Sequence, residues 1–192
     1  MRKSALFAFG AVLLAALPAS AKMVDGRYVA PGGAFSIAMQ ATTDKLFKLD
    51  KEASNADIVL IDLQYARSDG HANYAQRTIE WIRLDAPVPD VELDRHAADT
   101  VTGYLEGRLA GDNFIVTDRH KQRSESGQLI YSFAATGTVN GAPSAWHGAL
   151  LFFGGGVALV SQLNTAATQP MLDADGVTDA ELASWASTIR PE

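Results

Sequence analysis

The sequence contains no cysteine. A chain without thiols cannot form a disulfide, a thiolate metal site or a cysteine nucleophile, and it has no N-terminal cysteine that could carry a lipid. Long apolar runs are scarce as well: Ala5–Leu17 covers 13 residues, and no later run is longer. A helix of that length is too short to cross a hydrocarbon core of about 30 Å, so we expect no transmembrane anchor.

The first apolar run has the features of a secretory leader. Arg2 and Lys3 precede it, and Ala19-Ser20-Ala21 supplies the small residues that a signal peptidase needs. We therefore expect residues 1–21 to be a cleaved signal peptide and residues 22–192 to form a single soluble α+β domain. A leader and a chain without disulfides suit the periplasm of a Gram-negative bacterium, although the extracellular medium stays open.

Basic residues are outnumbered by acidic ones. The whole chain has 16 Lys and Arg against 22 Asp and Glu, a formal charge of −6. Loss of Arg2 and Lys3 with the leader leaves 14 basic against 22 acidic residues, a formal charge of −8. Such a surface repels nucleic acid and anionic lipid on average, so neither is expected as a partner.

The order of the predicted elements indicates an α+β fold. Two N-terminal hairpins come first, followed by a long helix with apolar residues at every fourth position, capped by Asp90 and closed by Gly111. A meander of four antiparallel strands then leads to a C-terminal helix, which begins at a capping box of Thr178 and Glu181. Beyond a first hairpin at 26–37, strands are expected at 58–65, 77–84, 114–122, 128–138, 144–153 and 157–163.

Composition also predicts where these strands lie. The last two are apolar on both faces, so they should be central or covered by a helix, whereas the charged strand at 114–122 should be near an edge or face water. The long helix and the C-terminal helix should cover this mainly antiparallel sheet. Trp81, Trp146 and Trp185 each belong to an element with an apolar face and are expected in the core, although an exposed pair would indicate a sugar-binding platform.

The N-terminal segment resembles a known group of proteins. Gly26-Arg27-Tyr28 followed by Pro31-Gly32-Gly33-Ala34-Phe35-Ser36-Ile37 is similar to the opening of the Mog1/PsbP-like α+β fold. That group includes many small exported bacterial proteins without an assigned function. The resemblance implies an accessory or binding role and no shared catalytic residues.

The most distinctive polar residues are Arg119, Lys121 and Arg123. They share one face of a predicted strand because side chains alternate with period two. They are thus a cluster of positive charges in a chain with an excess of acidic residues. They are candidates for binding an anionic ligand, a cell-wall polymer or an acidic protein partner. An edge strand also uses such charges to block unwanted pairing, which is the interpretation that we favour from the sequence.

His147 is the most informative of the four histidines. It follows Trp146 on an apolar strand, so it should be at least half buried and needs a hydrogen-bond partner or a functional role. A satisfied core histidine is the favoured interpretation, and His71, His96 and His120 are interpreted as solvated. No local metal-ligand motif and no phosphate-binding loop occurs, so we expect no metal and no cofactor.

These patterns favour a periplasmic, non-catalytic accessory protein that binds a partner protein or an anionic ligand. Arg119, Lys121, Arg123 and His147 are its candidate binding residues. One alternative is a small hydrolase in which His147 or His71 meets a carboxylate such as Asp62 in the folded chain. Another is a carrier that holds an apolar ligand between helix and sheet.

Overall fold

The computed structural model describes residues 22–30, 33–38, 47–54, 57–65, 75–108, 114–123, 127–153 and 155–191. Several predictions lie outside these residues: the leader at 1–21, the solvated His71 and the Gly111 helix stop. Within the described part, no helix is both long enough and apolar enough to cross a bilayer.

Seven strands of the described chain form one antiparallel sheet in the order β4-β5-β6-β10-β9-β8-β7. The strands are β4 (Phe47–Ser54), β5 (Ile58–Tyr65), β6 (Ala75–Arg83), β7 (Ile115–Arg123), β8 (Leu129–Val139), β9 (Ala142–Phe153) and β10 (Gly156–Thr165). Pairing of β10 with β6 joins the second predicted hairpin to the meander. The charged β7 lies at one edge, as its composition predicts, and β10 is central.

The first predicted hairpin belongs to a separate small sheet. Strands β1 (Lys22–Val24), β2 (Arg27–Val29) and β3 (Ser36–Ala38) pair antiparallel in that order. Asp25 and Gly26 turn the chain between β1 and β2, both with positive φ, as a tight hairpin requires. Ser36 exchanges two backbone hydrogen bonds with Arg190, so the C-terminal segment is fastened to this sheet.

Three α-helices occur in the described residues: α2 (Leu93–Arg108), α3 (Gln169–Ala174) and α4 (Asp179–Ala186). Asp90 does not cap the long helix, because it opens a 3-10 turn, η2 (Asp90–Glu92), that follows Pro89 and makes no side-chain cap bond. The predicted cap of α4 is confirmed, since the Thr178 hydroxyl accepts a hydrogen bond from the Glu181 amide at 3.2 Å. Neither α3 nor the edge strand β4 is predicted by the sequence pattern.

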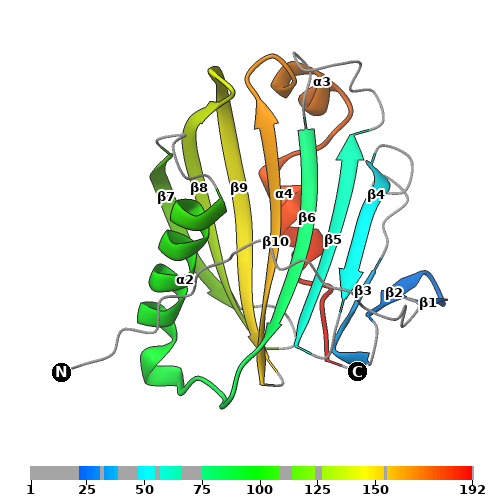
Figure 1. Cartoon of the computed structure of the whole chain (residues 1–192), viewed down its shortest axis with the longest axis vertical. Helices are drawn as coiled ribbons and strands as arrows, with labels where there is room; N and C mark the ends of the chain where they lie inside the picture. Colours follow the sequence, from blue (N-terminus) through cyan, green and yellow to red (C-terminus); the bar gives the residue numbers. More distant parts are fainter. Residues whose placement is uncertain are drawn as a thin grey trace.

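The two longer helices cover opposite faces of the large sheet (Figure 1). On the α2 face, Ala97 and Val101 pack into a core with apolar residues of β8, β9 and β10. On the α4 face, Leu182 and Trp185 pack into a second, larger core. This arrangement explains why β9 and β10 are apolar on both faces. Trp81, Trp146 and Trp185 are all buried, as predicted.

Candidate functional site

A β-bulge in the edge strand β7 decides which side chains reach which helix. Val116 pairs with Ala135 of β8, but Asp118 pairs with Ala134, so Thr117 is the extra residue. A bulge of this kind re-aims every side chain beyond it. Past Thr117, the odd-numbered residues of β7 face α2 and the even-numbered ones face α4.

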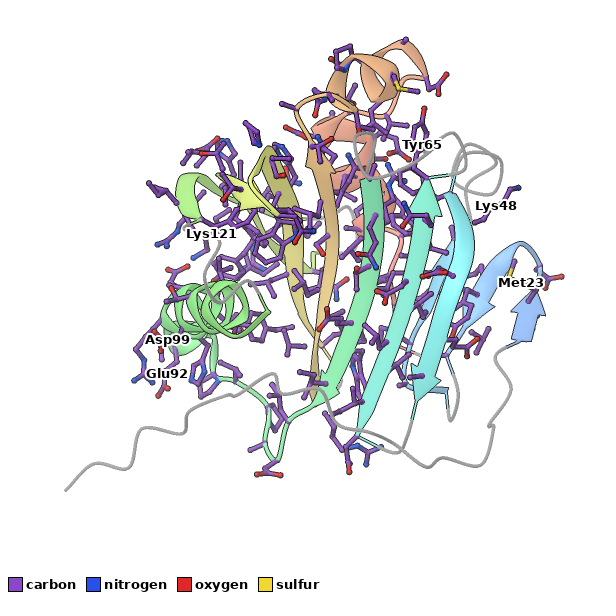
Figure 2. The ribbon with its side chains drawn as sticks, turned by 45° about the horizontal axis from the view of Figure 1, so that its top comes forward. Met23, Lys48, Tyr65, Glu92, Asp99 and Lys121 are labelled. Carbon is purple, nitrogen blue, oxygen red and sulfur yellow. The ribbon has the colours of Figure 1, made fainter. Side chains whose placement is uncertain are left out.

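Two of the predicted binding residues therefore line a cavity between α2 and the sheet, which we call the α2 cavity. It has a volume of about 210 Å³. Arg119 and Lys121 supply cations at its border. The apolar part of its lining comes from both the helix and β8, through Ala97, Ala98, Val101 and Phe133. Figure 2 shows Lys121 next to α2, whereas Asp99 is on the side of α2 that faces away from the sheet.

Lys121 is tied to α2 by an ion pair. Its Nζ atom lies 2.7 Å from Oδ1 and 2.9 Å from Oδ2 of Asp94. This hydrogen bond, and after it the Tyr131 hydroxyl, holds the pKa of the Asp94 carboxyl below its ordinary value. By contrast, the Arg119 guanidinium forms no ion pair within the described part of the chain. Of the two cations at the border of the α2 cavity, Lys121 thus has a carboxylate partner, whereas Arg119 has none among the described residues.

Tyr131 adds a polar atom to the same cavity. It lies directly opposite Lys121 on β8, and the Lys121 ammonium is 5.5 Å from the centre of its ring. Its hydroxyl is shielded from solvent and has no hydrogen-bond partner of good geometry among the described residues. The Asp94 carboxylate is nevertheless near enough to add to the effect of burial, and both raise the pKa of Tyr131. The Tyr131 hydroxyl is thus a shielded donor beside the Asp94 carboxylate, and a bound ligand carboxylate could take the place of Asp94 as its acceptor.

Arg123 does not share this cavity. Its Nη1 atom instead donates to the carbonyl oxygen of Gly127, just before β8, at 2.8 Å. At the same strand, Oδ1 of Asp118 accepts a hydrogen bond from the Arg119 backbone amide at 2.8 Å, so that amide is not available to pair with a further strand. The three cations therefore lie on one face, as predicted, but only two of them line the α2 cavity.

His147 lies on the opposite face of the sheet, so it does not form one site with the three cations. It borders a cavity of about 160 Å³ under α4, which we call the α4 cavity. Its side chain is 20% exposed, and its Nδ1 atom lies 3.1 Å from Oδ2 of Asp179. Asp179 is the first residue of α4 and is 67% exposed. The burial predicted for His147 is confirmed, and the charged group beside its Nδ1 atom is the Asp179 carboxylate.

Three more polar side chains line the α4 cavity, namely those of Asp118, His120 and Ser132. Nε2 of His120 lies 2.7 Å from Oδ2 of Asp118, and both side chains are more than half exposed. The two imidazoles are thus each held by a carboxylate. Within the described residues, no three of these groups come close enough together to hold a metal ion.

Asp62 cannot be the carboxylate that serves His147. Asp62 pairs with Thr78, which pairs with Ser161 of β10. Ser161 in turn pairs with Gly148, the residue after His147, so Asp62 and His147 point to opposite faces of the sheet. The Asp62 carboxylate instead accepts a hydrogen bond from the Thr78 hydroxyl at 3.1 Å.

A buried arginine fixes α4 beside its cavity. Arg77 of β6 is 1% exposed, and both of its terminal nitrogens donate to the Glu181 carboxylate. Its Nε atom donates to Gln162 at 2.9 Å. Burial lowers the pKa of Arg77, and the hydrogen bonds that Arg77 donates to Glu181 oppose that shift. The first turn of α4 is therefore held to the sheet by the ion pair between Glu181 and the buried Arg77.

Comparison with known proteins bears on the fold. No protein-family model matches the sequence, and no curated protein matches it. Among solved structures, cyanobacterial PsbP (CyanoP) from Synechocystis sp. PCC 6803 is similar with a TM-score of 0.56 and 10% sequence identity. That match covers 86% of this chain and 91% of CyanoP.

A second similar structure is PA94 from Pseudomonas aeruginosa, a protein of unknown function. Its TM-score is 0.51 at 14% identity, over 76% of this chain and 97% of PA94. At such low identity the likeness concerns the fold alone. The chain has a PsbP-like α+β fold, in agreement with the resemblance of its N-terminal segment.

Proposed function

We propose that this protein is an exported accessory protein that binds a small amphipathic carboxylate in the α2 cavity, without a chemical step at that site. The observation that carries this proposal is the convergence of Arg119, Lys121 and the Tyr131 hydroxyl on a cavity with apolar walls. Few precisely placed polar groups on an apolar lining are typical of ligand sites.

The charges at the border favour an anion. Arg119 has no carboxylate partner among the described residues, so a ligand carboxylate would compensate its charge without breaking a contact. Lys121 is already paired, but its side chain is 48% exposed and that of Asp94 is 69% exposed, so water screens their ion pair and a ligand carboxylate could replace Asp94 in it. The Tyr131 hydroxyl can donate to the same carboxylate.

The walls favour a short apolar tail. Ala97, Val101 and Phe133 offer no polar side-chain atom to a ligand, and each buried methylene would contribute about 0.8 kcal/mol to binding. A volume of about 210 Å³ is below the range of about 300–1,000 Å³ that is usual for drug-sized ligands. We therefore expect molecules such as hexanoate or benzoate rather than long-chain fatty acids.

Isothermal titration calorimetry of the purified protein tests this proposal. Hexanoate and benzoate should bind, and the neutral amides hexanamide and benzamide should bind at least 10-fold more weakly. Arg119→Gln should weaken hexanoate binding roughly 10-fold or more, because a hydrogen bond to a charged group is worth about 1.5–3 kcal/mol. Arg123→Gln is the matched control, on the same strand face but outside the cavity, and should change little. Equal binding of hexanoate and hexanamide would contradict the proposal.

Export is the second part of the proposal and rests on the leader sequence. The periplasmic fraction released by osmotic shock should contain a protein that begins at Lys22. A protein that keeps Met1 and stays in the cytosol would contradict it.

A further inference from the structure

The α4 cavity combines a serine with two oriented imidazoles. Its polar lining consists of Ser132, His120, His147 and the two carboxylates that bind these histidines. We propose that this cavity is an acyl-transfer site that hydrolyses small esters, with Ser132 as nucleophile, His147 as general base and His120 as oxyanion donor. Ser132 and His120 also border the α2 cavity, whereas His147 and Asp179 line the α4 cavity alone.

Strand register brings the serine within reach of both histidines. Ser132 lies directly opposite His120 of β7, and Ala134, two residues further along β8, lies directly opposite His147. Directly opposed Cβ atoms are about 4.5–5.5 Å apart and diagonal neighbours about 7–8 Å, distances that a Ser and a His side chain can bridge. No hydrogen bond occupies the Ser132 hydroxyl within the described residues, so it is free to turn towards His147.

His147 has the orientation that a general base requires. Its Nδ1 atom faces the Asp179 carboxylate at 3.1 Å, which selects the tautomer with the proton on Nδ1. The lone pair is then on Nε2, where it can accept the proton of Ser132. Asp179 is a positioning residue in this scheme, because it acts only through the imidazole. The Arg77–Glu181 ion pair fixes α4 and hence the place of Asp179.

His120 is placed to stabilise negative charge. Its Nε2 atom lies 2.7 Å from the Asp118 carboxylate, and in the imidazolium form of His120 the Nδ1–H is a second donor. Since His120 is directly across from Ser132, this donor lies near the carbonyl oxygen of an ester that Ser132 attacks. Asp118 reaches this face only because of the bulge at Thr117.

The proposed reaction has two balanced steps. Ser132 Oγ bonds to the ester carbonyl carbon, its proton passes to His147 Nε2, and the carbon–oxygen bond to the alcohol breaks as His147 returns that proton to the departing alcohol. Water then attacks the acyl-serine, its proton passes to His147 and on to Ser132 Oγ, and the carboxylic acid leaves. A cavity of about 160 Å³ restricts the acyl group to a few carbons.

Reaction with diisopropyl fluorophosphate, followed by intact mass and peptide mapping, tests the site directly. The wild-type chain should gain one diisopropylphosphoryl group, located on Ser132, and should hydrolyse p-nitrophenyl acetate. Ser132→Ala should lose both, and His147→Gln should slow the modification about 100-fold or more, the lower range for general base catalysis. Ser184→Ala, at an exposed serine of α4, is the matched control and should react like the wild type.

Asp179→Asn provides a variant at an exposed position that should fold normally. It should slow modification of Ser132 and change the pH dependence of ester hydrolysis, because the His147 tautomer is no longer selected. Failure of the wild-type Ser132 to react would overturn the proposal. So would equal rates of modification in the wild type and in a folded His147→Gln protein with an unchanged melting temperature.

Discussion

Replacement of Arg77 by Met should destabilise the fold strongly. The guanidinium is 1% exposed and donates to Glu181 and Gln162, and its Cζ atom lies 4.3 Å from the ring centre of Phe47 and 5.2 Å from that of Trp185. Methionine fills similar space but leaves a mostly buried carboxylate without its partner. Removing one member of a buried ion pair costs about 3–5 kcal/mol. For a domain of this size, each kcal/mol lowers Tm by about 2–4 °C.

Arg83→Met is the matched control on the same strand. Its ion pair with Asp57 has a distance of 3.7 Å, and both side chains are at least 60% exposed. Exposed pairs contribute about 0–1 kcal/mol, so the control should be close to the wild type. Urea unfolding followed by tryptophan fluorescence measures both variants. An Arg77→Met variant that lost no more unfolding free energy than Arg83→Met would show that the Arg77–Glu181 ion pair does not hold α4 to the sheet.

Two further predictions concern packing and pH. Gly156→Ala should destabilise the protein by about 1–3 kcal/mol in urea unfolding, because the added Cβ would lie 2.3 Å from Nε1 of Trp81; a neutral effect would contradict this packing. Lys121→Gln should raise the pKa of Asp94 measured by NMR, since the ammonium is the main cause of its depression. The stabilisation by Asp94 is present above its unfolded pKa of about 3.9 and is lost as pH falls through the lower folded value, so Lys121→Gln should reduce stability near pH 5 more than near pH 2. An unchanged Asp94 pKa would contradict the ion pair.

The place of a strand in the sheet could be predicted where its composition reflects what surrounds it. β9 and β10 are apolar on both faces because they lie between two cores, and β7 is charged because it is an edge. β4 was missed because it is the other edge strand and carries charges among few apolar residues. The N-terminal hairpin belongs to its own sheet and is bridged at Ser36 to Arg190, a contact between distant segments that no local pattern reveals.

The candidate sites could be predicted only in part. Alternation correctly placed Arg119 and Lys121 on one face, but the face that they share depends on the bulge at Thr117, which has no sequence signature. The partner of His147 is Asp179, 32 positions later and on a helix, so only the packing of α4 brings the two together. Nothing in the sequence around Ser132 marks it as functional. Only the strand register places it directly opposite His120 and diagonally from His147.

Methyl NMR during a titration with hexanoate tests the central claim most directly, because the methyl groups of the two cavities report separately on them. Ala97 and Val101 line the α2 cavity, whereas Ala149 and Ala183 line the α4 cavity on the other face of the sheet. We predict saturable shifts of the Ala97 and Val101 signals with the Ala149 and Ala183 signals unmoved. Shifts confined to Ala149 and Ala183, or none at all, would contradict a carboxylate site under α2.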